Sequence, residues 1–178
     1  MSALSPIEAS KKLAAFKSID NHVRDGDVVG IGSGSTIVYA VERLSERVKS
    51  EGIKVRCIPT SFQARQLIQT HGLILSSLET DPRCSVTIDG CDEADSDLTL
   101  IKGGGGCLAQ EKVVAYYSDL FVTIADYRFK SVRTRTGHFF VWHIILFVFS
   151  PSTERTPLAS EPPGNTCPSK YFLWRINR

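Results

Sequence analysis

The sequence has 178 residues, of which 42% are apolar and 22% charged, a composition typical of a soluble globular protein of one domain with an appendage. The first ten residues lack a basic start followed by an apolar run, so we expect no secretory signal and a cytoplasmic location. The net charge of +2 is divided unevenly: residues 1–127 carry 13 basic and 17 acidic side chains, and residues 128–178 carry 8 and 2.

The five cysteines, at positions 57, 84, 91, 107 and 167, are odd in number and form no C-x-x-C pair. This pattern argues against a disulfide framework and against a zinc ribbon. We therefore expect reduced thiols, no metal site and, at most, oxidation sensitivity where a cysteine lies next to a functional group.

The first predicted element is a helix from Pro6 to about Val23. Ser5 suits the N-cap, proline suits the first helical position, and Glu8 can reach back to the N–H of the cap. The apolar residues expected on the buried face are Ile7, Leu13, Phe16, Ile19 and Val23.

A short buried strand, Val28–Ile31, is followed by the turn Gly32-Ser33-Gly34-Ser35-Thr36 and then by an amphipathic helix that Gly52 ends. Small residues, hydroxyls and backbone N–H groups at a helix start form a cradle for a phosphate group. The turn lacks the G-K-[ST] of a nucleotide P-loop and the third glycine of a dinucleotide fingerprint, so a single phosphate fits better than a nucleotide. A capped helix start without a ligand is the alternative.

Strands and helices alternate through the rest of the first 128 residues, which predicts an α/β fold with a mostly parallel sheet and flanking helices. Pro59 is expected to break the strand that precedes it, and Ser61 to cap a helix that carries Phe62 and ends at Gly72. The expected strands are Val55–Ile58, Leu73–Leu75, Ser85–Ile88 and Leu120–Ala125, and a further helix is expected at Leu108–Tyr116.

The segment from Asp89 to Glu111 carries the densest chemistry, reading D-G-C-D-E-A-D-S-D-L-T-L-I-K-G-G-G-G-C-L-A-Q-E. Asp89 and Asp92 follow a strand at its carboxyl end, where open α/β sheets bind their ligands. Four glycines expose backbone N–H groups, and if Cys107 opens a helix, Glu111 lies about one turn inside it. A solvated acidic turn followed by a mobile glycine loop is the plainer interpretation.

This inventory suits proton transfer between adjacent carbons of a sugar. Such a reaction needs a carboxylate base beside the C–H bond and a positive group beside the oxygen as an enediolate forms. Glu111 fits the first role and Lys102 the second.

The segments D-G-C-D-E and K-G-G-G-G-C-L-A-Q-E-K resemble the signature of type A ribose-5-phosphate isomerase, with Cys91 in place of the usual alanine. The resemblance covers about residues 6–128. It implies a Rossmann-like isomerase and CoA-transferase-type fold, from which the small C-terminal domain of the family is missing here.

The resemblance also implies the interconversion of ribose 5-phosphate and ribulose 5-phosphate, without a cofactor, in a homo-oligomer. The basic tail lacks a recognisable nucleic-acid-binding motif, and we expect neither nucleic acid nor a membrane as a partner. Glu111 would move the proton, Lys102 and the glycine amides would stabilise the enediolate, and Asp89 and Asp92 would bind hydroxyls and assist ring opening. The substrate-binding residues that it implies are Lys11, Ser33, Gly34, Ser35, Thr36, Asp89, Gly90, Cys91, Asp92, Lys102, Gly103, Gly104 and Gly105.

Residues 129–178 depart from the family pattern. An apolar run from Phe139 to Phe149 is too short to span a membrane, and five of the eight prolines fall in the last 28 residues. The run is either a replacement strand beside Phe121–Ala125 or, as we favour, part of a poorly ordered tail from an alternative exon, a retained intron or a frameshift. His138 and His143 lack the spacing of metal ligands.

Two further interpretations remain beside an active isomerase. The first is a catalytically impaired isoform that binds only a sugar phosphate or a full-length subunit. The second is a misassembled product without a folded function.

Overall fold

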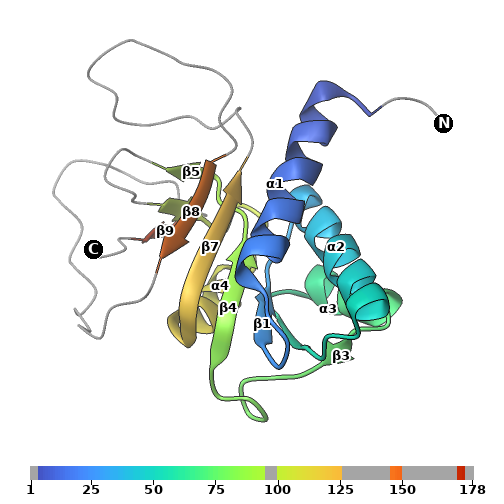
Figure 1. Ribbon diagram of the computed structural model, residues 1–178. Helices are drawn as coiled ribbons and strands as arrows, with labels where there is room; N and C mark the ends of the chain where they lie inside the picture. The colour runs from blue at the N-terminus through green and yellow to red at the C-terminus, as the bar shows by residue number, and fades with distance from the viewer. Residues whose placement is uncertain (1–3, 95–99, 126–144, 150–171, 175–178) are drawn as a thin grey trace, which may run out of the picture.

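The computed structural model describes residues 4–94, 100–125, 145–149 and 172–174, and Figure 1 shows their arrangement. The main sheet has the strand order β3-β2-β1-β4-β7-β8, and its first five strands are parallel. These strands are β1 (Val28–Ile31), β2 (Arg56–Pro59), β3 (Ile74–Leu75), β4 (Cys84–Asp89) and β7 (Ser118–Ala125). The predicted α/β class with a mostly parallel sheet is confirmed.

Helices cover both faces of this sheet, as the alternation of strands and helices predicts (Figure 1). One face packs against α1 (Pro6–His22), α2 (Ser35–Glu51) and α3 (Phe62–Thr70), and the other packs against α4 (Leu108–Tyr116). No helix in the described part of the chain is long and apolar enough to cross a membrane.

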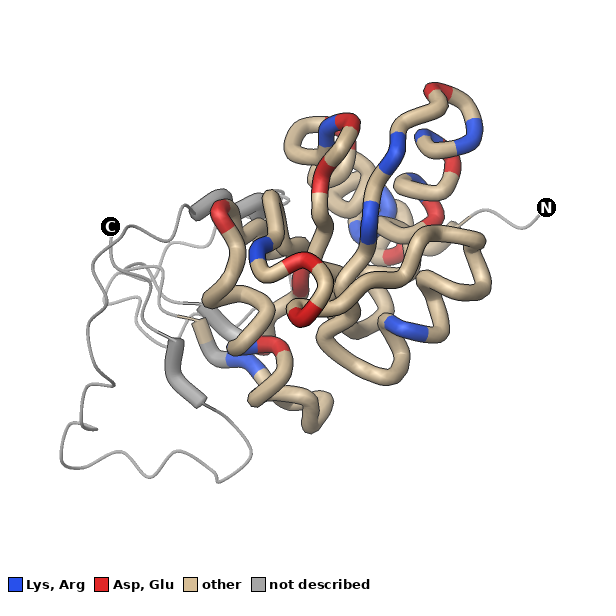
Figure 2. Tube along the Cα trace, turned by 90° about the horizontal axis from the view of Figure 1, so that it is seen from below, with Lys and Arg blue, Asp and Glu red and all other residues tan. Residues whose placement is uncertain are grey.

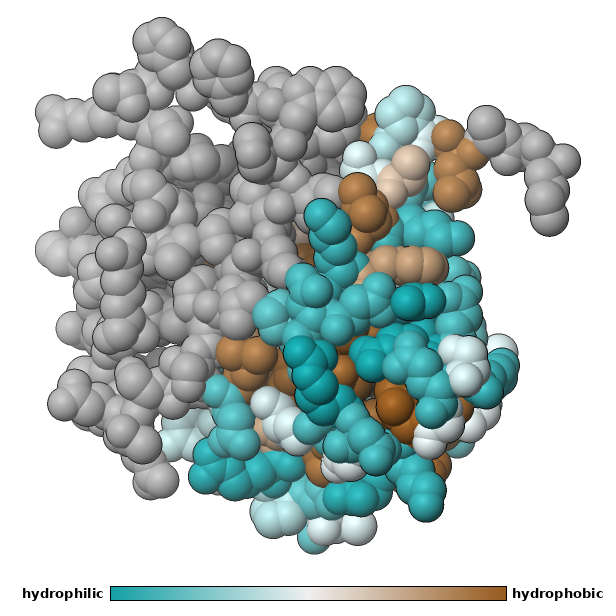
Figure 3. Space-filling view, in the orientation of Figure 1, coloured by the Kyte–Doolittle hydropathy of each residue, from teal (hydrophilic) through white to brown (hydrophobic). Residues whose placement is uncertain are grey.

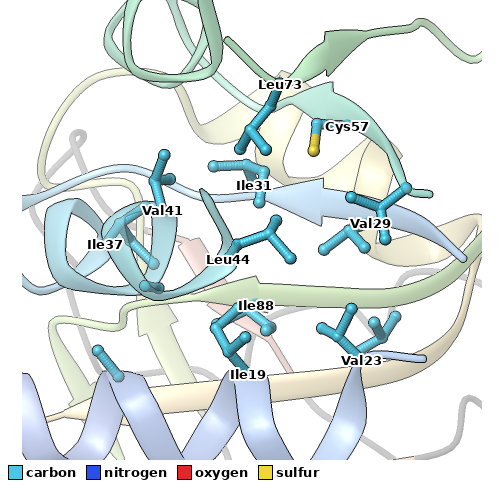
Figure 4. Close-up of a cluster of buried hydrophobic side chains, with 14 of the residues drawn as sticks. Ile19, Val23, Val29, Ile31, Ile37, Val41, Leu44, Cys57, Leu73 and Ile88 are labelled. Atoms are coloured by element: carbon cyan, nitrogen blue, oxygen red, sulfur yellow. The ribbon is translucent and has the colours of Figure 1, made fainter. Parts of the chain in front are cut away.

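The main core lies between the sheet and the first three helices. Figure 4 shows Ile19 of α1 and Leu44 of α2 pointing toward Val29, Ile31 and Ile88 of the strands, and all five are at most 1% exposed. Alternate strand residues face opposite sides of a sheet, so the same strands leave their other side chains for α4 and the pocket described below. The outer surface over α1 and α2 is mainly hydrophilic, with separate apolar residues (Figure 3).

Helix α1 starts as predicted, because the Ser5 side chain accepts a hydrogen bond from the N–H of Glu8 at 3.3 Å. The predicted buried face is wrong at Leu13, which is 48% exposed, whereas Lys11, Ala15 and Ile19 are buried. Leu13 is two residues from both Lys11 and Ala15, and two residues turn a helix by about 200°. Leu13 therefore points away from the buried face.

Proline 59 does not break its strand but ends it. It is the last residue of β2 and pairs in register with Ile31. Helix α2 ends as predicted, with Gly52 in the left-handed conformation at φ 73°, and Ser61 caps α3 by accepting the N–H of Ala64 at 3.1 Å.

A small second sheet was not predicted. It has the order β5-β6-β9, formed antiparallel by Glu93–Ala94, Leu100–Lys102 and Phe172–Trp174. Strand β6 carries Lys102, so the lysine belongs to a strand and not to the glycine loop that follows it.

Part of the apolar run after residue 128 also forms a strand. Residues Ile145–Phe149 form β8, which pairs antiparallel with β7, with Phe149 opposite Phe121 and Ile145 opposite Ala125. This is the arrangement that the replacement-strand interpretation predicts. The favoured interpretation is that residues 129–178 form a poorly ordered tail, and most of these residues lie outside the described part of the chain. His138, His143 and Cys167 also lie outside it.

Candidate active site

A pocket of about 590 Å³ opens at the carboxyl ends of β1 and β4. Strand β1 continues into the turn at the start of α2, and strand β4 ends at Asp89. The pocket is lined by every predicted site residue except Lys11, namely Ser33, Gly34, Ser35, Thr36, Asp89, Gly90, Cys91, Asp92, Lys102, Gly103, Gly104, Gly105 and Glu111. Parallel strands end on the same edge of the sheet, which explains why residues so far apart in sequence meet here.

Three buried charged groups line the pocket and contact one another. The Nζ atom of Lys102 lies 2.9 Å from Oδ2 of Asp89 and 3.4 Å from Oε2 of Glu111. The exposed fractions of the three side chains are only 3%, 2% and 5%. One ammonium thus sits between two carboxylates, and it also donates to the carbonyl oxygen of Gly90.

Burial and charge act in opposite directions on Lys102. Burial disfavours its ammonium form, but the carboxylates of Asp89 and Glu111 outweigh that effect and raise the lysine pKa. Lys102 therefore remains positively charged across the physiological pH range.

Burial and the nearby carboxylate of Asp89 raise the pKa of Glu111, while Lys102 and the hydroxyl of Ser33 act in the opposite direction. A carboxylate with a raised pKa is a stronger base than an ordinary glutamate. Glu111 reaches this position because Cys107 is the N-cap of α4, as predicted, so the first turn of the helix directs the carboxylate toward Lys102.

Ser33 joins the turn before α2 to this charged cluster. Its N–H donates to Oδ1 of Asp89 at 3.1 Å, and its Oγ donates to Oε1 of Glu111 at 3.1 Å. The preceding Gly32 leaves the space that Asp89 needs, because a Cβ atom at that position would lie 2.0 Å from Oδ1. The turn and the carboxylates therefore fit together only with glycine at position 32.

The turn itself presents the start of α2 to the pocket. Gly34 is the N-cap, with φ 103°, and the first N–H groups of a helix have no acceptor within the helix. Lys11 does not line the pocket, but its Nζ lies 3.0 Å from Oγ of Ser35 and 2.8 Å from Oε1 of Glu8. Backbone amides, hydroxyls and an ammonium thus gather at one place, which suits an anionic group.

The glycine loop after β6 forms the opposite wall. Gly103 and Gly106 have φ values of 93° and 88°, which favour glycine, and the N–H of Gly106 donates to the carbonyl of Gly103 at 2.8 Å. Asp92 accepts the N–H of Gly104 at 2.9 Å. Asp92 therefore holds this loop in addition to lining the pocket.

Several lining residues were not predicted as site residues. Ser61, Phe62 and Gln63 come from the start of α3, and Ile124 and Ala125 come from the end of β7. Phe62 was assigned only to its helix, yet its ring is 72% exposed. Their position follows from the strand order: β2 lies next to β1, so the segment that follows β2 must begin beside the same pocket.

The four described cysteines are free thiols, as predicted. Cys57 and Cys84 are buried, whereas Cys91 and Cys107 are half-buried and line the pocket. Burial raises the pKa of Cys91 to about 12, so this thiol stays protonated at neutral pH.

Comparison with known proteins identifies the family of this chain. The family model described as ribose 5-phosphate isomerase A (phosphoriboisomerase A) matches residues 56–150, more than half of the chain. Ribose-5-phosphate isomerase of Sus scrofa is 59% identical over 170 residues, which cover 96% of this chain and 53% of that protein.

Solved structures are similar as well. Ribose 5-phosphate isomerase from Plasmodium falciparum is 41% identical with a TM-score of 0.66, covering 68% of this chain and 52% of that one. A D-ribose-5-phosphate isomerase in complex with phospho-erythronic acid is 36% identical with a TM-score of 0.67, covering 70% and 54% of the two chains. The chain thus spans about half the length of these relatives. By sequence and by fold, the chain belongs to the ribose 5-phosphate isomerase A family.

Proposed function

We propose that this chain interconverts D-ribose 5-phosphate and D-ribulose 5-phosphate through an enediolate. The observation that carries the proposal is the buried cluster in which Lys102 lies 2.9 Å from Asp89 and 3.4 Å from Glu111. It combines a strengthened base with a fixed positive charge, the two groups that an aldose–ketose isomerisation requires.

The phosphate group of the substrate fits the start of α2. The N-terminal amides of the helix, the hydroxyl of Ser35 and the ammonium of Lys11 are donors there, and Gly34 allows the chain to turn away from the ligand. A relative whose structure is described in complex with phospho-erythronic acid supports a phosphorylated sugar derivative as the ligand class.

The sugar carbons then lie over the buried cluster. Glu111 removes the proton from C2 of the open-chain aldose, and the electrons of that C–H bond form the C1–C2 double bond as the carbonyl oxygen becomes negative. Lys102 stabilises this oxygen. Returning the proton from Glu111 to C1, with a proton moving from the hydroxyl oxygen on C2 to that on C1, gives the ketose.

Asp89 and Asp92 have supporting roles in this scheme. Asp89 fixes Lys102 and the turn at Ser33, and Asp92 holds the glycine loop through Gly104. Both carboxylates can also accept hydrogen bonds from sugar hydroxyls and assist opening of the furanose ring.

The test is conversion of ribose 5-phosphate to ribulose 5-phosphate by the purified full chain, with Glu111→Gln as the comparison. A positioned base accelerates proton transfer about 10²–10⁴-fold, so kcat of the variant should fall by at least about 10²-fold. Equal rates for the two proteins would overturn the proposal.

The same samples address the alternative of an impaired isoform. A cooperatively melting chain whose melting temperature rises with ribose 5-phosphate, but which shows no turnover, would be a sugar-phosphate binder and not an isomerase.

A further inference from the structure

The side chain of Gln63 connects the starts of two helices across the pocket. Gln63 is the second residue of α3, and its Oε1 accepts a hydrogen bond of 2.9 Å from the N–H of Gly34, the N-cap of α2. Both residues line the pocket. Gln63 thus lies against the turn at which the proposed phosphate site begins.

This hydrogen bond fixes the roles of the two ends of the amide. A glutamine side chain has an acceptor oxygen and an NH₂ group that only donates. Since the oxygen is held by a backbone N–H, Nε2 is the end left for another partner, and it has none among the described residues.

The groups at the turn that Gln63 contacts favour an anion as that partner. The start of α2 adds partial positive charge, and Lys11 places its ammonium 3.0 Å from the hydroxyl of Ser35 in the same turn. Gln63 reaches the same turn from a different helix, α3, through its hydrogen bond with Gly34.

We propose that Gln63 donates from Nε2 to the phosphate group of the substrate while Oε1 holds Gly34, which makes it a specificity-determining residue for phosphorylated sugars. This inference rests on the proposed function and adds to it a recognition group that none of the sequence motifs contains.

Gln63→Glu separates ligand binding from a purely structural role. Glutamate keeps an oxygen that can accept the N–H of Gly34, but it replaces the donor by a negative charge. An acidic residue in the first turn of a helix is favourable, so α3 should fold as before. A purely structural Gln63 would therefore tolerate glutamate, whereas a phosphate ligand would not.

The matched control is Gln66→Glu, which makes the same charge change about one turn further along α3, at an exposed residue that does not line the pocket. Gln63→Met is a second variant that keeps the length of the side chain but has neither the amide oxygen nor the NH₂ group. Thermal melts establish that each full-length variant is folded.

Inorganic phosphate is the first probe, measured by titration calorimetry, and the KM for ribose 5-phosphate is the second. We expect Gln63→Glu to weaken phosphate binding about tenfold or more, since a hydrogen bond to a charged group is lost and repulsion is added. KM should rise by a similar factor with kcat nearly unchanged, Gln63→Met should show a smaller effect, and Gln66→Glu should resemble the unsubstituted chain.

Phosphate binding by Gln63→Glu at the strength of Gln66→Glu would overturn the inference, as would the absence of phosphate binding by the unsubstituted chain. If the unsubstituted chain binds phosphate but does not convert ribose 5-phosphate, the proposed function fails, while the comparison of the two glutamate variants still decides the role of Gln63.

Discussion

At the scale of single residues, the pocket depends on one ammonium that separates two buried carboxylates. Lys102, Asp89 and Glu111 are all buried, so water screens these charges very little. Without the lysine, two buried carboxylates would face each other without the positive charge between them. The stability of this site and its chemistry therefore depend on the same side chain.

Lys102→Ala should lower the free energy of unfolding by about 3–5 kcal/mol at neutral pH, the usual cost of breaking a buried ion pair. The loss should be smaller near pH 5, where protonation of a carboxylate relieves the repulsion. Denaturant unfolding at the two pH values measures this difference, with Lys17→Ala, an exposed lysine of α1, as the control. An equal loss at both pH values would contradict the electrostatic explanation.

The raised pKa of Glu111, caused by burial and by Asp89, predicts the pH dependence of turnover. The base acts in its ionised form, so kcat/KM should fall as the pH drops through that pKa, at a higher pH than for an ordinary glutamate. A profile of kcat/KM against pH measures the acidic limb. A limb at or below the ordinary glutamate pKa would contradict the environment described for Glu111.

The same shift has a consequence for stability. The folded protein binds the Glu111 proton more tightly than the unfolded chain does, so this group contributes stability below its unfolded pKa and loses it as pH rises through the folded pKa. Glu111→Gln lacks this loss. The melting temperature of Glu111→Gln minus that of the unsubstituted chain should therefore be larger at pH 8 than at pH 4. A difference that does not change with pH would contradict the raised pKa of Glu111.

At the scale of elements, the sequence predicted best where periodicity and end signals coincide. Strand β1 and helix α4 have the predicted boundaries, and α2 ends at the predicted glycine. Leu13 was misplaced because α1 buries small and polar residues such as Ala15 and Lys11, which an apolar pattern does not reveal. Strands β5 and β6 are too short for alternation to identify them, and their pairing depends on contacts distant in sequence.

Most of the residues that line the pocket belong to motifs that the sequence analysis singled out, since each motif is local in the sequence. The contacts between motifs were not predictable in the same way. The bonds of Ser33 with Asp89 and Glu111 span 56 and 78 residues, and no local signal encodes such a pairing. Phe62 and Gln63 were missed for the same reason, because their position follows from the order of strands in the sheet.

Gly32 shows how one position ties an element to the site. Because a Cβ atom there would lie 2.0 Å from Oδ1 and 2.6 Å from Cα of Asp89, Gly32→Ala should displace the aspartate and, through it, Lys102. We expect a loss of turnover of about 10²-fold or more, comparable with the loss of one oxyanion donor. A rate for Gly32→Ala equal to that of the unsubstituted chain would contradict the prediction.

Strand β8 makes a prediction for the edge of the sheet. It pairs with β7 through residues 145–149, with Val148 opposite Val122. Val148→Pro removes a backbone donor from this strand and should uncover the edge of β7, an open template for association. Size-exclusion chromatography should then show more aggregate than for the unsubstituted chain, and an unchanged profile would argue against this pairing.

At the scale of the whole molecule, the residues that line the pocket lie between Ser33 and Ala125, and the chain spans about half the length of its relatives. Acidic and basic positions are interspersed along the described fold (Figure 2), and the excess of positive charge belongs to residues 128–178. In the proposed reaction, Lys102 and Glu111 act as one catalytic unit.

The joint role of Lys102 and Glu111 is tested most directly by four rates of ribose 5-phosphate isomerisation: those of the full chain, of Lys102→Ala, of Glu111→Gln and of the double variant. Without its base the reaction cannot use the positive charge of Lys102, so the double variant should be about as slow as the slower single variant. Losses that multiply in the double variant would contradict a joint role, and a folded, unsubstituted chain without turnover would contradict the proposed function.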